Sequence, residues 1–184
     1  MSPEFELAIR CAMALVFLSA ASGKFRHWVA LRGVIDNFRL LPAWSVPIAA
    51  AILPPFEAAV GMMLLLPSNP RWPPTARLTE IPAMALLMLF AMAMGINLAR
   101  GRLEIDCGCF QGALRQRISG WLVARNCLYV TLLGVAYSSP PNIPEPALVL
   151  NGVLAGIGLF IAAQCLELTK SLRPSWAVSR RGAI

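Results

Sequence analysis

The sequence has few charged residues, one histidine and only 5 cysteines, and each shortage makes a class of protein less fitting. Asp, Glu, Lys and Arg make up 14% of its 184 residues, whereas a soluble domain carries roughly 25%. The chain therefore lacks the charge that the surface of a soluble domain needs. A zinc centre takes about four ligands. His27 stands with few thiols near it in the sequence, so we expect no metal site.

Apolar residues make up 58% of the chain and gather in long runs. Since a bilayer crossing takes about 20 apolar residues, five segments are long enough to span a membrane: 5–22, 46–66, 79–98, 119–138 and 147–168. Prolines at 47, 54 and 55 predict a kink or a break in the second, and Arg125 with Asn126 makes the fourth the least regular. The sequence predicts one domain, 1–184, an all-α polytopic membrane bundle of four to five transmembrane helices.

The ends and connectors of these segments carry the topological signals. Glu4 and Glu6 precede the first apolar run in place of a basic leader, so we expect a retained span and not a cleaved signal. Twelve basic residues fall on one side of a five-span arrangement, and only Arg71 and Arg77 on the other. The positive-inside rule then places the connector 99–118 in the cytoplasm. The net charge of +7 lies in connectors and does not indicate nucleic-acid binding.

The segment 24–40 is patterned as an amphipathic helix. Apolar side chains recur at near-helical spacing between Phe25 and Phe38, with Lys24, Arg26, Arg32 and Arg39 among them. Such a pattern is typical of a helix that lies on the membrane surface, with lipid as its partner. Two interpretations remain open: a link with snorkelling cations, or a lid over the bundle close to the connector 99–118.

That connector contains Cys107-Gly108-Cys109, the main candidate catalytic pair. Two thiols separated by one glycine close only a small disulfide ring, which does not easily reach relaxed disulfide geometry. Such a bond should be strained and exchangeable, and this favours a thiol–disulfide oxidoreductase. An inert reduced pair and a metal site are the alternatives. Arg102 is a candidate supporting residue, because nearby cations favour the thiolate.

The electrons of such an exchange need an acceptor. A second dithiol is one choice, and a membrane quinone is the other, with Phe110 and Trp121 as candidate walls for its ring. The other three cysteines lie in apolar segments, where cysteine usually behaves as a small buried hydrophobe. Among them Cys127 is the first candidate for a resolving thiol, because it lies in the span after the pair.

Three ionisable residues, Arg10, Glu57 and Arg125, fall inside the predicted spans. A charge in the bilayer interior costs several kcal/mol unless it is paired or hydrated. We therefore expect Glu57 to pair with an arginine inside the bundle. The alternative is that Glu57 accepts a proton in thiol or quinol chemistry.

Several stretches of the chain, together covering most of residues 8–128, carry a resemblance to a known family. The most specific piece is Asn97-Leu-Ala-Arg-Gly-Arg102 running into Asp106-Cys-Gly-Cys-Phe-Gln-Gly112. With Phe38-Arg-Leu-Leu-Pro42 and Pro54-Pro-Phe-Glu-Ala-Ala-Val-Gly61, it resembles the methylamine utilisation MauE family, a branch of the DoxX-like membrane proteins. Family members more often read Cys-Gly-Cys-Phe-Gly; here Gln111 comes before Gly112.

The resemblance implies a place in the bacterial inner membrane and a role in maturing an exported, disulfide-rich protein, the small subunit of methylamine dehydrogenase. It also implies a thioredoxin-like partner of the MauD type. A client outside the cytoplasm favours periplasmic thiols, against the charge rule, and we expect the periplasmic side. The alternative functions are a non-catalytic scaffold or export factor for that client, and a carrier of small solutes or reducing equivalents.

Overall fold

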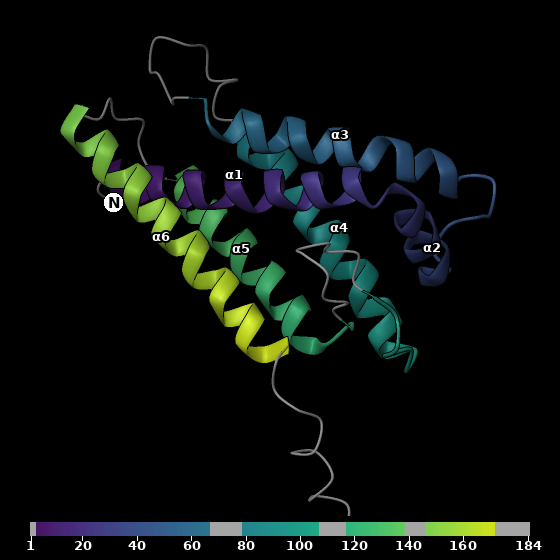
Figure 1. Ribbon diagram of the computed structural model, residues 1–184. Helices are drawn as coiled ribbons and strands as arrows, with labels where there is room; N and C mark the ends of the chain where they lie inside the picture. Colours follow the sequence, from purple (N-terminus) through teal and green to yellow (C-terminus); the bar gives the residue numbers. More distant parts are fainter. Residues whose placement is uncertain (1–2, 67–78, 107–116, 139–145, 172–184) are drawn as a thin grey trace, which may run out of the picture.

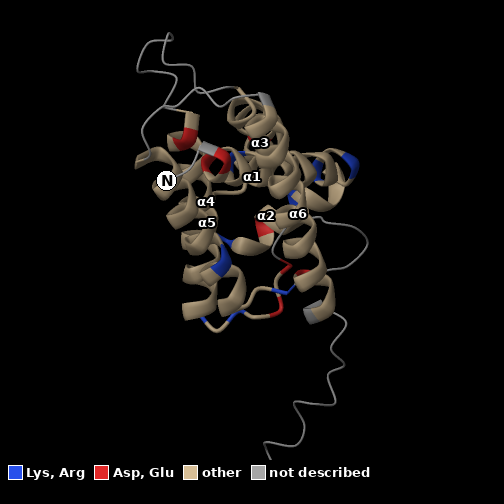
Figure 2. Cartoon of the chain, turned by 90° about the vertical axis from the view of Figure 1, so that its left-hand side faces the viewer, with Lys and Arg blue, Asp and Glu red and all other residues tan. Residues whose placement is uncertain are grey.

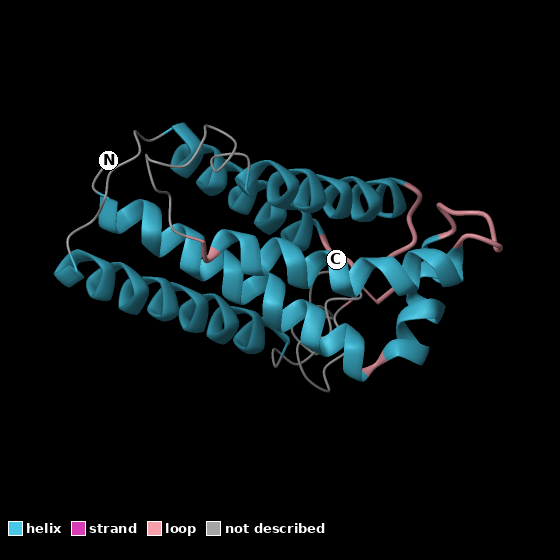
Figure 3. Ribbon diagram, turned by 90° about the horizontal axis from the view of Figure 1, so that it is seen from above, coloured by secondary structure: helices cyan, strands magenta, loops and turns pink. Residues whose placement is uncertain are grey.

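A computed structural model describes residues 3–66, 79–106, 117–138 and 146–171 of the chain. The described residues form six helices (Figures 1 and 3): α1 Pro3–Arg26, α2 Trp28–Phe38, α3 Val46–Leu64, α4 Glu80–Ala99, α5 Gly120–Ser138 and α6 Pro146–Ser171. Apart from one isolated β-bridge, the described part of the chain contains only helices, turns and loops. The predicted all-α fold is confirmed.

Four of the described helices are long and apolar enough to cross a membrane: Glu4–Arg26, Val46–Leu64, Glu80–Ala99 and Ala147–Thr169. The fifth long helix, α5, has 19 residues but carries Arg125 and Asn126 and is less apolar than α3, α4 and α6. The chain is a multi-pass membrane protein. Its described part has four candidate spans, and α5 is a fifth long helix that is more polar. This agrees with the predicted bundle of four to five spans.

The central element is α1, which packs against α3, α5 and α6 (Figure 1). Glycines let the neighbouring backbones approach it closely. A Cβ built on Gly156 of α6 would lie 2.7 Å from Cβ of Cys11, and one on Gly61 of α3 would lie 2.9 Å from Cγ of Leu18. Close approach at small residues is a common way to pack helices in lipid, where apolar burial adds little. Together, α3 and α6 enclose α1 from two sides.

The prolines of α3 do not break it. The helix runs without interruption from Val46 to Leu64, with Pro54 and Pro55 inside it. Proline has no backbone N–H, so Pro54 cannot donate to the carbonyl of Ala50 in the preceding turn. Helix α3 packs against α1 and α2, and neighbouring helices commonly allow proline inside membrane helices.

The amphipathic segment 24–40 is divided between two helices. Helix α1 continues to Arg26, so Lys24 belongs to the bundle and not to the interfacial helix. Helix α2 begins after His27 and buries Leu31 and Val34, and it packs mainly on α3. Its buried apolar face therefore meets protein.

Candidate functional site

A tight helix end positions the start of the connector between α4 and α5. Gly101 has a φ of +70°. Its N–H donates to the carbonyl of Leu98 at 3.0 Å, and the N–H of Arg102 donates to that of Asn97 at 3.0 Å. These two bonds form a Schellman motif, which ends a helix with a left-handed residue, usually glycine. The guanidinium of Arg102 also donates to Oδ1 of Asn97 at 3.3 Å.

The two ends of this connector meet at a packed base. The N–H of Ile118 donates to the carbonyl of Ile105 at 2.9 Å, and Asp106 and Arg117 form an antiparallel bridge. Both isoleucines are buried in one apolar cluster with Met94 of α4 and Leu122 of α5. Phe38 of α2 packs against the same cluster, so α2 lies beside the base of the connector. Cys107, Cys109 and Phe110 lie outside the described residues.

A buried ion pair lies deeper in the bundle. Nζ of Lys24 on α1 is 2.6 Å from each carboxylate oxygen of Glu57 on α3. The two side chains are 5% and 0% exposed. Nζ also lies 5.4 Å from the centre of the Phe90 ring of α4, a distance within the range of a cation–π contact. Glu57 has the basic partner expected of it, and this contact is made by Lys24 and not by an arginine.

A second pair joins α5 to α6. Nη1 of Arg125 lies 3.1 Å from Oε1 of Glu167, and the side chains are 11% and 10% exposed. Nε1 of Trp121 donates to the same carboxylate oxygen at 2.9 Å. Two side chains of α5 therefore contact the Glu167 carboxylate of α6. The guanidinium carbon of Arg125 lies 5.8 Å from the centre of the Tyr129 ring.

Both pairs line one cavity of about 40 Å³. Its lining comes from five helices and mixes Lys24, Glu57, Arg125 and Glu167 with the polar Asn126 and Gln164 and with apolar side chains. Phe90 lines this cavity and also packs against the cluster at the base of the connector. One aromatic ring therefore contacts both the charged interior and the packing that supports the cysteine-containing connector.

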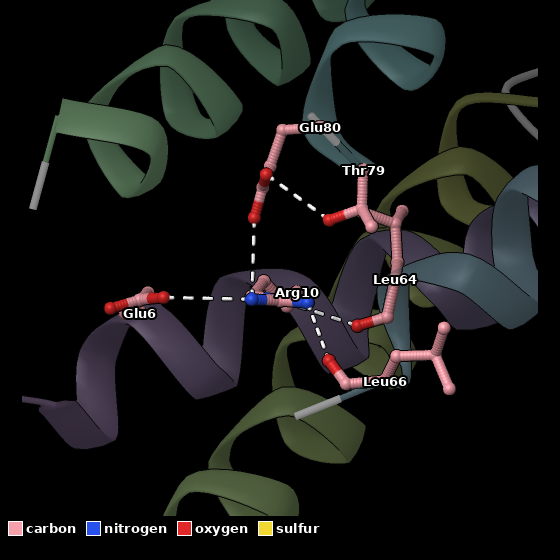
Figure 4. Close-up of polar contacts among 6 residues, drawn as sticks. All are labelled: Glu6, Arg10, Leu64, Leu66, Thr79 and Glu80. Carbon is pink, nitrogen blue, oxygen red and sulfur yellow. Dashed lines mark hydrogen bonds and ion pairs between the residues drawn. The ribbon is translucent and has the colours of Figure 1, made fainter. Parts of the chain in front are cut away.

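A third group of charges surrounds Arg10 (Figure 4). Its guanidinium donates to the carbonyls of Leu64 at 3.3 Å and Leu66 at 2.6 Å. It also lies 3.6 Å from a carboxylate oxygen of Glu6 and 3.3 Å from one of Glu80. Arg10 thereby ties α1 to the end of α3 and the beginning of α4. Figure 2 shows that most of the helical surface is tan, with charged residues at scattered places along the helices.

A family model described as Methylamine utilisation protein MauE matches residues 2–139. The chain belongs to the MauE family. A protein of Paracoccus denitrificans named methylamine utilization protein MauE is 40% identical over 151 residues, 81% of this chain and 78% of that protein. The protein of that name from Methylorubrum extorquens is 40% identical over 133 residues, 72% and 68% of the two chains. No solved structure gives a significant match.

The MauE family match includes the cysteine-containing connector and the buried Lys24–Glu57 pair. The Schellman turn, the cysteine pair and the Lys24–Glu57 pair all fall within residues 2–139, whereas Glu167 lies beyond them. The chain is thus a methylamine utilisation protein of the MauE type by family.

Sequence reasoning missed two members of the cavity. The sequence predicts Lys24 in the interfacial helix, because Ser22-Gly23 after the first apolar run is typical of a turn, whereas α1 continues through both residues. Glu167 lies inside the expected span 147–168, and its presence in an apolar segment was the signal that should have marked it. Asn97 of α4 donates to the carbonyl of Ala93 on its own helix and accepts from Arg102.

The remaining cysteines differ in exposure. Cys11 is buried, as expected for a small hydrophobe, whereas Cys127 and Cys165 are exposed on the outer faces of α5 and α6. Cys127 therefore does not line the cavity. Its assignment as a resolving thiol stays a prediction. No three His, Cys, Asp or Glu side chains within the described ranges come together as a metal site would require.

Proposed function

We propose that this MauE-family protein is a membrane thiol–disulfide exchange protein in the maturation of an exported, disulfide-rich client, by family resemblance the small subunit of methylamine dehydrogenase. The observation that carries the proposal is the Cys-Gly-Cys sequence in a connector whose two ends are hydrogen-bonded over a packed base. This base fixes Asp106 and Arg117, the described residues on either side of the cysteine-containing segment.

The exchange involves the two cysteines in sequence. One thiolate of Cys107 or Cys109 attacks a disulfide of a thioredoxin-like partner, forming a mixed disulfide and releasing one partner thiolate. The second thiol of the pair then loses its proton and displaces the other partner sulfur. The pair ends oxidised, and the partner has gained two electrons and two protons. A disulfide passed in the opposite direction follows the same steps reversed.

Trapping the mixed disulfide tests this proposal. Cys107→Ser or Cys109→Ser removes the thiol that resolves the intermediate, so one single variant should accumulate a covalent complex on non-reducing electrophoresis. The double variant should accumulate none and should leave the client's disulfides incomplete by mass. Cys165→Ser, which changes an exposed cysteine of α6, is the matched control. A double variant that still yields a fully oxidised client would leave the scaffold or export role as the better function.

The side of the membrane is tested separately. In a background with Ser at positions 11, 127 and 165, only Cys107 and Cys109 remain to react. We expect a membrane-impermeant thiol reagent to label them in intact cells after mild reduction, because an exported client meets periplasmic thiols. Labelling only after lysis would place the pair in the cytoplasm, where the count of basic residues points.

A further inference from the structure

The cavity between the two buried ion pairs is large enough for water and small for an organic ligand. One water needs about 10–15 Å³ of such space, and the cavity measures about 40 Å³, so it has room for roughly three waters. A quinone ring is larger than this space. The quinone expected beside the cysteine pair stays a prediction for another place in the molecule.

The lining gives those waters the partners they need. A buried water typically makes about three hydrogen bonds to polar groups, and empty cavities are apolar. Here the amides of Asn126 and Gln164 join Lys24, Glu57 and Glu167 around the space. Five polar side chains from α1, α3, α5 and α6 supply more donors and acceptors than the ion pairs alone require.

The charges of the cavity also balance. Lys24 pairs with Glu57, and Arg125 with Glu167, so the site as a whole adds no net charge to the bundle interior. Burying an ion pair remains costly because its two groups lose their water. Water in the cavity would offset that cost where these four ionised side chains converge.

We infer that this cavity is a hydrated proton-exchange site centred on the Lys24–Glu57 pair. A proton delivered by cavity water converts the Glu57 carboxylate to the acid, and Lys24 gives one of its three protons to a second water. The acid then passes its proton across the 2.6 Å contact to the amine, which restores the ion pair. One proton enters and one leaves, and the pair returns to its starting charge.

Phe90 links this site to the proposed thiol exchange, and this link alone rests on that function. Its ring faces Nζ of Lys24 and packs on the cluster beneath the cysteine-containing connector. Thiol exchange requires one proton to leave the attacking thiol and another to reach the released sulfur. A hydrated exchange site in the same end of the bundle supplies an acceptor and a donor for those protons.

The chain allows a direct measurement because it has only two lysines, Lys24 and Lys170. In Lys170→Arg protein labelled with ¹⁵N at the lysine side chain and placed in lipid bilayers, the single ammonium signal reports Lys24. Solid-state NMR then measures magnetisation transfer from water to that nitrogen. We expect efficient transfer, because water lies within hydrogen-bond distance of the pair.

Filling the cavity provides the decisive comparison. Ala163 lines the cavity, and the adjacent Ala162 is exposed on the outer face of α6. Ala163→Leu should slow the transfer several-fold, and Ala162→Leu should leave it unchanged. Ala20→Val, which fills the same cavity from α1, decides the matter if Ala163→Leu does not fold. No transfer in the starting protein, or equal transfer with and without the filling residue, overturns the inference.

Glu57→Gln separates proton exchange from mere hydration. The amide cannot take up the proton, so proton exchange at Lys24 should slow several-fold while the cavity stays wet. An unchanged exchange rate would contradict the role given to Glu57. Repeating the measurement with Cys107→Ser and Cys109→Ser keeps the two proposals distinct, since a failed thiol function leaves the water signal as it is.

Discussion

Arg10 and Lys24 are both cations of α1, and both are buried, at 3% and 4% exposure, but their surroundings differ. Arg10 is enclosed by two carboxylates and two main-chain carbonyls (Figure 4), which bind α1 to α3 and α4. Lys24 contacts one carboxylate and one aromatic ring, and it lines a cavity shared with a second ion pair. Arg10 links three helices through its contacts, whereas Lys24 lines a cavity with room for water.

This difference shows that a charge inside a membrane span is not by itself evidence of chemistry. A charged side chain in an apolar bundle needs partners in either case. What separates the two sites is the space beside them, and four predictions test that separation, from the largest expected loss of stability to the smallest.

Arg10→Met should cause the largest loss. The change leaves the buried carboxylate of Glu80 and the carbonyls of Leu64 and Leu66 without the guanidinium, and breaking a buried pair typically costs about 3–5 kcal/mol. Titrating the protein in mild detergent micelles with a denaturing detergent measures the change in its free energy of unfolding. Arg26→Met, at an exposed position in the last turn of α1, is the control. Equal stability of the two variants would show that the contacts of Arg10 do not stabilise the bundle.

Lys24→Met should cost less, about 1–3 kcal/mol, the usual range for a buried group left unsatisfied. Cavity water can hydrate the Glu57 carboxylate that remains. Adding Glu57→Gln should recover most of the loss, because it removes the isolated charge. Adding Glu80→Gln to Arg10→Met should recover little, since the carbonyls of Leu64 and Leu66 still lose the guanidinium as a donor. Equal recovery in both double variants would erase the proposed difference.

Gly156→Ala tests whether helix packing sets the cavity. The added methyl would meet Cβ of Cys11 at 2.7 Å and the carbonyl of Ala8 at 2.8 Å, and overpacking of this kind costs about 1–3 kcal/mol. It should push α6 away from α1 and change the rate of water transfer to Lys24. The contacts of Arg10 should stay intact. Gly158→Ala, with nothing within 4 Å, is the control, and a similar loss there would refute a packing cause.

Gly101→Ala should have the smallest effect, about 1 kcal/mol of destabilisation, because alanine is strained where φ is positive. Gly95→Ala, in the interior of α4 with open space around it, should stabilise by about 0.5–1 kcal/mol. The opposite signs identify the helix end as the cause. If the thiol function is correct, Gly101→Ala should also slow formation of the mixed disulfide, whereas Gly95→Ala should not.

The sequence by itself determined the long helices and the turn that begins the connector. Runs of about 20 apolar residues have no stable alternative to helix in lipid, where every backbone group needs an internal partner. Gly101 marks the end of α4 because only glycine takes a positive φ at little cost. Such local rules act over a few residues and can be read directly. The cysteine pair was proposed in the same way, from its spacing, and its role stays a prediction.

Only the tertiary structure decided which charges meet. Nothing local to Glu57 distinguishes Lys24, 33 residues away in the chain, from Arg10 or Arg125 as its partner. The choice follows from how α1 is enclosed by α3 and α6 at Gly61 and Gly156, which sets the register of the helices. A shift of one residue along a helix turns the side-chain direction by about 100° around the helix axis, so partners and cavities depend on packing that no single segment encodes.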